Sequence, residues 1–376
     1  MTPRDDVKIE LNDFPDYDRV LQANRDLRDS LMLNDDEMEM IAGENPETFD
    51  DVSFDLIPSF DDASAPDKSP DSHQEAAENK DDPLNLAFTL REKDEMPLPR
   101  MSDMTRPILF RLSPDGDLWI VDQPDESLFR FACIREGRVP TGFTVPRGME
   151  EFSVGFPGAL IVGKSGDLYI LDVLQQTIHK FSAGGQYDRN FHDQIMAASP
   201  LMSIRSFALD ESRSILAVTD FLRGTLKLFL PDGREQKEIP LRNDEQGQLE
   251  STPTAVAIAP SGSLYVADSP HGILHRLDEA GVVSSVHRLD ERALREAPFC
   301  VNMFCDAAGF LFLGDLQSQS ILACDGTGVL KGVFHTGPDS LTPNISMNCF
   351  DVRSDGALLV LDSLRFKIHT LQFQAV

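Results

Sequence analysis

The stretch Pro260-Ser-Gly-Ser-Leu-Tyr-Val-Ala-Asp268 (PSGSLYVAD) decides the fold of this chain. A turn signal, Pro-Ser-Gly, is followed by an apolar run that ends on an aspartate. A glycine-containing turn between apolar segments is typical of a β-hairpin. The stretch therefore predicts a strand entered through a tight turn, and it leaves open whether Asp268 has a chemical or a structural role.

Six versions of this stretch occur, and their final aspartates lie 47 to 50 residues apart. Each version has leucine four residues before the aspartate and Ile, Val or Leu two residues before it. The aspartates are Asp122, Asp172, Asp220, Asp268, Asp315 and Asp362. A fixed period in this range indicates a repeat architecture.

Each repeat contains further strand-like segments around the one that ends on the aspartate. An apolar segment precedes the turn, as in AVAIA (255–259), and another follows a polar loop, as in ILHRL (273–277). Three or four short strands in about 48 residues form one propeller blade, and a middle strand packed on both faces is apolar throughout. The fold class predicted from the six repeats is an all-β, six-bladed β-propeller.

The repeats resemble the NHL-repeat family of β-propellers, whose units run through a Gly-hydrophobic-Tyr-Val-Ala-Asp core into a polar loop and a further strand. The segment PSGSLYVADSPHGILHRL (260–277) carries the resemblance most clearly, and the likeness covers about residues 105–376. Proteins of this shape include interaction scaffolds, RNA binders, lactonase-like hydrolases and a secreted copper/zinc lyase. The resemblance therefore implies a fold and leaves the function open.

The last repeat ends at KIHTLQFQAV (367–376), which leaves no room for a fourth strand. Upstream of the first repeat, residues 84–90 (LNLAFTL) alternate apolar with small or polar side chains. We expect this segment to be the outer strand of the last blade, because closing the ring removes an exposed sheet edge. The propeller domain would then span residues 84–376. The alternative is that residues 84–90 dock a partner.

The formal net charge is −29, and residues 1–83 carry 25 acidic against 7 basic side chains. Affinity for nucleic acid and anionic lipid depends on lysine and arginine, so this balance argues against nucleic acid and membrane as partners. The sequence shows no signal-peptide pattern and no apolar run long enough to span a bilayer, which predicts a cytoplasmic location.

Residues 1–83 form an acidic arm with two parts. Residues 61–83 lack bulky apolar groups and are predicted to be a disordered linker. Residues 1–60 mix acids with apolar side chains, a composition common in segments that fold on a protein partner. The alternative is a solubilising tail. The predicted partner-binding residues are Tyr17, Val20, Leu27, Leu31, Phe49, Phe54 and Phe60.

The six repeated aspartates are predicted to be structural, with each carboxylate accepting hydrogen bonds from the loop after its strand. Three histidines, His179, His275 and His369, follow their aspartates by seven residues, where another repeat has Lys227. A repeat position that accepts different basic residues predicts an exposed polar site rather than a metal triad.

The lactonase-like propellers hold a metal ion at the central channel with a Glu, Asn and Asp set. Here the resemblance provides Asn302 and Asn348 as channel candidates, without a matching carboxylate. Motifs such as GxSxG and HExxH are also missing from the sequence. We therefore predict no catalytic residues, no metal site and no cofactor.

These observations favour a non-catalytic protein-interaction platform, an adaptor or assembly subunit, with the propeller as a rigid scaffold and the arm as a recruiting tail. The alternative is a metal-dependent lactonase-like hydrolase or a propeller that binds a small ligand in its channel. A third possibility is autoinhibition, in which the arm covers a basic loop surface of its own propeller.

Overall fold

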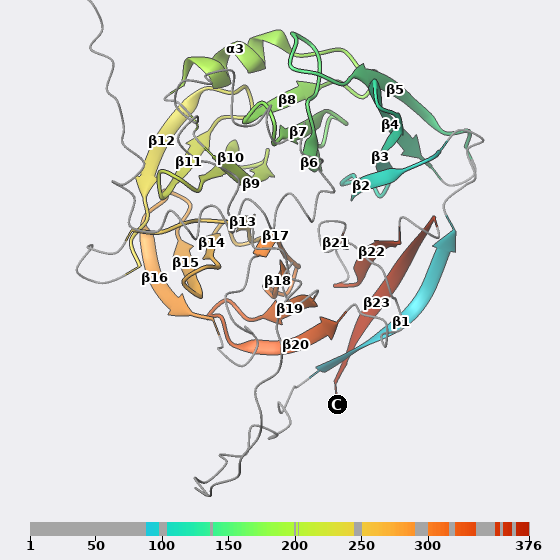
Figure 1. Cartoon of the computed structure of the whole chain (residues 1–376). Coiled ribbons are helices and arrows are strands. Elements are labelled where there is room, and N and C mark those ends of the chain that lie inside the picture. The colour runs from blue at the N-terminus through green and yellow to red at the C-terminus, as the bar shows by residue number, and fades with distance from the viewer. Residues whose placement is uncertain are drawn as a thin grey trace, which may run out of the picture.

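The computed structural model describes residues 88–97, 104–135, 138–198, 201, 203–243, 250–289, 300–315, 320–335, 350–353, 356–362 and 366–375. Over these residues the chain forms six antiparallel sheets arranged as blades around a central axis (Figure 1). The protein is thus an all-β, six-bladed propeller, as the repeat period predicts.

Each blade is numbered in chain order and begins with the strand nearest the axis. Blade 1 contains β2 (Pro107–Leu112), β3 (Leu118–Asp125), β4 (Leu128–Ile134) and β5 (Thr141–Pro146). Blade 2 contains β6 (Pro157–Val162), β7 (Leu168–Asp172) and β8 (Thr177–Phe181). Blade 3 contains β9 (Ile204–Asp210), β10 (Ile215–Asp220), β11 (Thr225–Phe229) and β12 (Glu235–Pro240).

The remaining blades complete the ring. Blade 4 contains β13 (Ala255–Ile258), β14 (Leu264–Asp268), β15 (Ile273–Leu277) and β16 (Val283–Arg288). Blade 5 contains β17 (Cys300–Cys305), β18 (Leu311–Asp315), β19 (Ser320–Cys324) and β20 (Leu330–His335). Blade 6 contains β21 (Phe350–Val352), β22 (Leu358–Asp362), β23 (Lys367–Ala375) and β1 (Phe88–Pro97).

The second strand of each blade forms the core. Every residue of β7, β10, β14, β18 and β22 is buried, as are the first six residues of β3. These strands have a neighbouring blade on each face, which is why they carry apolar side chains without alternation. The leucine shared by all repeats lies in this layer, with an exposed fraction between 0 and 4%.

The turn that introduces each second strand needs a positive φ. In PSGSLYVAD, Gly262 has φ 89°, and its N–H donates to the carbonyl of Ala259 at 2.8 Å to close the hairpin. Glycine adopts this conformation without strain, which explains its recurrence before the second strand. In the third repeat Ser214 takes its place, with φ 56°.

The ring is closed by a strand from the N-terminal side of the domain. β1 pairs antiparallel with β23, from Phe88 opposite Ala375 to Pro97 opposite Lys367, with a register shift between Glu92 and Asp94. The expected closing segment, residues 84–90, overlaps this strand only at 88–90, and residues 84–87 lie outside the described residues. The strand continues seven residues beyond the expected end.

Blade 2 departs from the repeat because it has three strands. Beyond β8 the chain forms α3 (Arg189–Ala197), which lies at the outer rim of the blade (Figure 1). Asp188 caps the helix by accepting the N–H of Phe191 at 3.0 Å, and Phe191 and Ile195 are its buried side chains. An apolar helix face thus covers the outer edge of this blade.

Candidate functional site

A cavity of about 150 Å³ lies at the propeller axis, walled by the inner strands of all six blades. Most of its lining side chains are apolar, among them Leu160, Phe207 and Ile258. The channel candidate Asn302 is on β17 and lines this cavity. The second candidate, Asn348, lies outside the described residues.

The charged groups of this cavity are Arg111 and Asp351. An Arg111 Nη1 lies 3.0 Å from Asp351 Oδ1, and the guanidinium lies over the Phe304 ring, 4.1 Å from its centroid. Asp351 Oδ2 also accepts the backbone N–H of Leu112 at 2.9 Å. Burial raises the pKa of Asp351 and lowers that of Arg111, while their mutual attraction opposes both shifts.

Sequence reasoning missed this ion pair, although the repeat contains a signal for it. Arg111 and Asp351 occupy the same position of the inner strand, each opposite the residue that follows the shared leucine. The corresponding residues of the other blades are uncharged: Ile161, Ala208, Ala257 and Phe304. The signal for the pair is that this position is charged only in blades 1 and 6. These blades meet where the ring closes, and their two charges are opposite.

Other polar groups near the axis link neighbouring blades. Ser206 of blade 3 is 4% exposed, and its Oγ accepts the N–H of Val256 of blade 4 at 3.2 Å. Ser269 of blade 4 accepts the N–H of Cys300 of blade 5 at 3.0 Å. Buried hydroxyls with such bonds hold adjacent blades in register.

The repeated aspartates are buried at the ends of the second strands, each at most 1% exposed. Asp172 accepts the N–H groups of Gly155 at 2.6 Å and Phe156 at 3.2 Å, and those of residues 174–175 at 3.0 Å each. Its carboxylate thereby joins the loop before the inner strand to the loop after the second strand. His179 Nε2 lies 3.2 Å from the same carboxylate.

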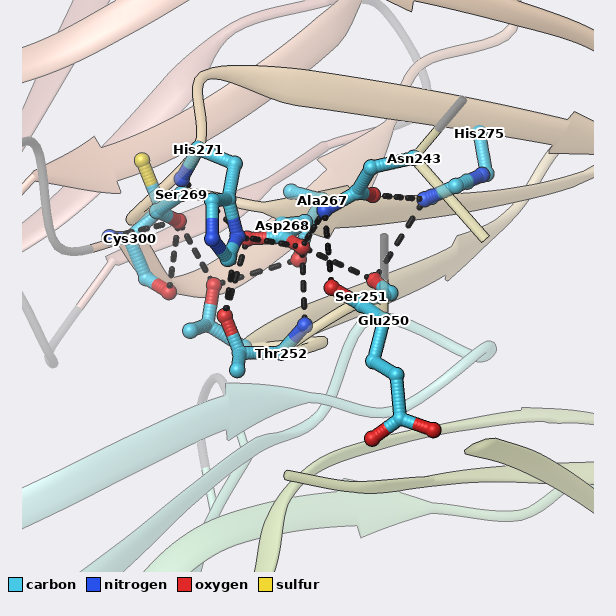
Figure 2. Close-up of polar contacts among 11 residues, drawn as sticks. Asn243, Glu250, Ser251, Thr252, Ala267, Asp268, Ser269, His271, His275 and Cys300 are labelled. Carbon is cyan, nitrogen blue, oxygen red and sulfur yellow. Dashed lines mark hydrogen bonds and ion pairs between the residues drawn. The ribbon is translucent and has the colours of Figure 1, made fainter. Parts of the chain in front are cut away.

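Asp268 is the centre of a larger polar network (Figure 2). Its carboxylate accepts hydrogen bonds from Asn243 Nδ2 at 2.7 Å, Ser251 Oγ at 2.9 Å, and the N–H of Thr252 at 2.8 Å. His271 Nδ1 lies 2.8 Å from Oδ1. Burial alone would raise the pKa of Asp268, but these partners, His271 foremost, lower it below its ordinary value.

His275 completes this network (Figure 2). Its Nε2 lies 3.0 Å from Asn243 Oδ1 and 3.4 Å from Ser251 Oγ, and its Nδ1 has no hydrogen-bond partner among the described residues. Burial lowers the pKa of His275 to about 4, against a smaller opposing attraction to Asp268. The ring is therefore neutral at pH 7.

The prediction that the side chain seven residues after the aspartate is exposed is wrong. His179, His275 and His369 are 0 to 3% exposed, and Lys227 is fully buried. The third strand places this side chain on the same face as the aspartate, where it lies inside the blade stack. Two of these histidines lie near the aspartate of their own repeat, His179 Nε2 at 3.2 Å from Asp172 and His369 Nε2 at 3.7 Å from Asp362.

The Asp268 network brings together a serine, a histidine and an aspartate, but its geometry does not suit nucleophilic catalysis. Ser251 Oγ donates to Asp268, and the serine is 1% exposed, so a substrate carbonyl has no approach to it. Within the described ranges, no three His, Cys, Asp or Glu side chains form a group that could hold a metal ion.

The predicted partner-binding residues Tyr17, Val20, Leu27, Leu31, Phe49, Phe54 and Phe60 lie outside the described residues. The described residues also contain no helix with the length and apolar character needed to cross a bilayer.

The chain is similar to solved β-propellers. A virginiamycin B lyase from Staphylococcus aureus superimposes with a TM-score of 0.50 at 12% identity, covering 76% of this chain and 99% of that protein. A streptogramin B lyase structure gives 0.49 at 13%, covering 76% and 98%. The WD40 β-propeller domain of Doa1 gives 0.45 at 13%, covering 76% and 97%. At this identity the likeness shows the fold alone.

No family model matches the chain. The search of curated proteins finds no significant match.

Proposed function

We propose that this protein is an NHL-type propeller that serves as a protein-interaction platform, an adaptor or assembly subunit without catalytic activity of its own. The propeller is the rigid scaffold, and residues 1–60 recruit a protein partner through Tyr17, Val20, Leu27 and Leu31 and through the segment from Phe49 to Phe60. The proposal places the protein in the cytoplasm and gives it neither nucleic acid nor membrane as a partner.

The arrangement of the central channel is the observation that supports this proposal most. A small-ligand site needs several polar groups that converge on the ligand. Here the two charged side chains of the cavity, Arg111 and Asp351, face each other at 3.0 Å. The hydroxyl of Ser206 is engaged in a bond between blades. The polar groups of the axis are thus arranged to hold the scaffold together.

The test is co-purification from the source cell with the full chain as bait. The control bait is a variant with Phe49, Phe54 and Phe60 replaced by serine. We expect a protein partner to be recovered with the wild-type chain and lost with the variant. Recovery of the same proteins with both baits would contradict the role of the arm.

One observation favours the alternative, a channel that binds a small ligand or a metal ion for hydrolysis. Asn302 lines a cavity of about 150 Å³, which is large enough for a few atoms beyond water. Calcium at millimolar concentration should then raise the Tm of the wild-type chain and leave that of Asn302→Leu unchanged. Equal melting curves with calcium and with a chelator would remove the best version of this alternative.

A further inference from the structure

The rim of blade 2 has a feature that the repeat does not explain. Phe152, in the loop between β5 and β6, has φ 67° and an exposed fraction of 45%. A positive φ is costly for an aromatic residue, by about 1 to 2 kcal/mol, and such strain persists where the surrounding structure imposes it. The backbone is thus held in a conformation that leaves half of a phenyl ring in solvent.

Phe152 is the outer end of a line of aromatic rings that begins in the core. Phe131 stacks on Phe143 at 5.2 Å, and Phe143 lies 5.7 Å from Phe181. Phe181 contacts Tyr187 edge-on at 5.2 Å, and Tyr187 contacts Phe152 in the same way at 5.1 Å. The exposed ring therefore rests on the partly buried Tyr187, which packs on the buried Phe181, and such support is the property of a preorganised anchor.

The loop that carries Phe152 is fixed to blade 2 on both sides. Gln175 Nε2 donates to the carbonyls of Gly148 at 3.0 Å and Ser153 at 3.2 Å. Glu151 pairs with Arg189 of α3 at 3.0 Å. The Gln175 hydrogen bonds thus hold both ends of residues 148–153, and the exposed Glu151–Arg189 pair lies between this segment and α3.

Two exposed methionines come from this loop and from α3, the two segments joined by the Glu151–Arg189 pair. Met149, in the same loop, is 47% exposed, and Met196, in the last turn of α3, is 62% exposed. Met196 Sδ lies 3.8 Å from Thr177 Oγ1. Thr177 is two residues after Gln175, whose side chain holds the loop. Methionine adapts its shape to different apolar surfaces and is enriched where proteins bind one another.

The rim of this surface is acidic. Residues 147–153 and 188–197 carry four carboxylates, those of Glu150, Glu151, Asp188 and Asp193, and two guanidiniums, those of Arg147 and Arg189. Glu151, Asp193 and Arg189 are 52, 62 and 65% exposed, so this charge faces solvent. A carboxylate-rich rim repels nucleic acid and also repels the arm of this chain, whose first 83 residues hold 25 acidic and 7 basic side chains.

We infer that Met149, Phe152 and Met196 form a binding site for a segment of another protein that carries apolar side chains flanked by lysine or arginine. The apolar side chains of that segment cover the Phe152 ring and the two methionines, and its basic groups face Glu150, Glu151 and Asp193. The site rests on the proposed role as an interaction platform and names one surface of the scaffold. The site gives α3 a role in binding, because the helix provides Met196 and part of the acidic rim. The helix lies where the other blades have a fourth strand.

The test uses the full chain and two labelled 14-residue probe peptides, one composed of leucine and lysine and one of leucine and glutamate. Fluorescence anisotropy is measured for the wild type, for Phe152→Gly, for Met196→Ser and for Val286→Ser as a matched control, since Val286 is 42% exposed on blade 4. We expect the lysine peptide to bind about tenfold more weakly to Phe152→Gly and Met196→Ser, and equally well to the control. The glutamate peptide should not bind.

Glycine at position 152 removes the ring but accepts the positive φ, so this variant should stay folded. Hydrogen exchange with the lysine peptide should protect residues 147–153 and 189–197. Equal binding to all variants, or protection confined to the acidic arm, would overturn the site. Sedimentation velocity provides a further check, because a wild-type dimer dissociated by Phe152→Gly would mean that a second copy occupies the surface. Co-purification through the arm tests the proposed function separately, so either idea can fail alone.

Discussion

The Asp268 network of blade 4 and the Phe152 surface of blade 2 differ in how they relate to the repeat. Asp268 has an equivalent in every blade, is fully buried, and accepts hydrogen bonds from Asn243, Ser251 and Thr252. No other repeat has an aromatic residue at the position of Phe152, 20 residues before the aspartate. Phe152 is 45% exposed and lies on strained backbone near the single helix of the described residues. The comparison teaches that the repeated positions of this propeller stabilise the ring, whereas the departures from the repeat are where function should be sought.

Replacing Asp268 should have the largest effect on stability. Asp268→Ala leaves Asn243, Ser251 and the backbone N–H of Thr252 buried without their acceptor. We expect the free energy of unfolding to fall by about 3 to 5 kcal/mol, measured by urea denaturation. Asp115→Ala, at an exposed turn position, is the control and should leave the urea midpoint unchanged. A small change for Asp268→Ala would mean that the repeated aspartate is not a structural support.

The channel pair should have the next largest effect. Asp351→Ala leaves the Arg111 guanidinium in the cavity without its carboxylate, which should cost about 3 kcal/mol. Replacing both residues by leucine should recover most of that loss, because the remaining positions of this ring are uncharged. Urea denaturation of Asp351→Leu, Arg111→Leu and the double leucine variant gives the coupling energy. Additive losses would show that the two side chains do not stabilise each other.

The buried histidine of the network predicts a pH dependence. The folded pKa of His275 is lowered to about 4, below the unfolded value of about 6.5, so the unfolded chain binds more protons as the pH falls. The contribution of His275 to the free energy of unfolding is therefore complete above pH 6.5 and is lost as the pH falls towards 4. The free energy of unfolding should decrease through this residue by about 2 kcal/mol between pH 7.5 and pH 4.5. His275→Gln should show a correspondingly shallower pH profile. An NMR titration in which His275 protonates near pH 6.5 would contradict the prediction.

The Phe152 surface should have the smallest effect on stability. Phe152→Gly relieves the positive φ but loses the contact with Tyr187, and the two effects offset each other to within about 1 kcal/mol. Phe152→Ala keeps the strain and loses the contact, so it should have a lower Tm than Phe152→Gly. The reverse order in differential scanning calorimetry would show that the backbone of residue 152 is not strained.

Much of the architecture follows from the repeat alone, because a period of 47 to 50 residues and a shared leucine specify where each buried strand lies. The histidines that follow the aspartates show where such reasoning fails. A repeat position that holds histidine in three blades and Lys227 in another has the composition of a surface site, yet His275 is buried beside Asn243 and Ser251. Composition does not show that the third strand turns this side chain into the space between blades.

The number of blades, the buried second strands and the turn glycine of PSGSLYVAD follow from the sequence, because they depend on local periodicity and on backbone conformations that few residues adopt. Only the tertiary structure brought Arg111 to Asp351, residues 240 positions apart that meet where the ring closes. It also brought the loop that carries Phe152 to α3, where Glu151 pairs with Arg189. Such contacts depend on how the blades are placed around the axis, and that placement is a property of the closed ring rather than of any one repeat.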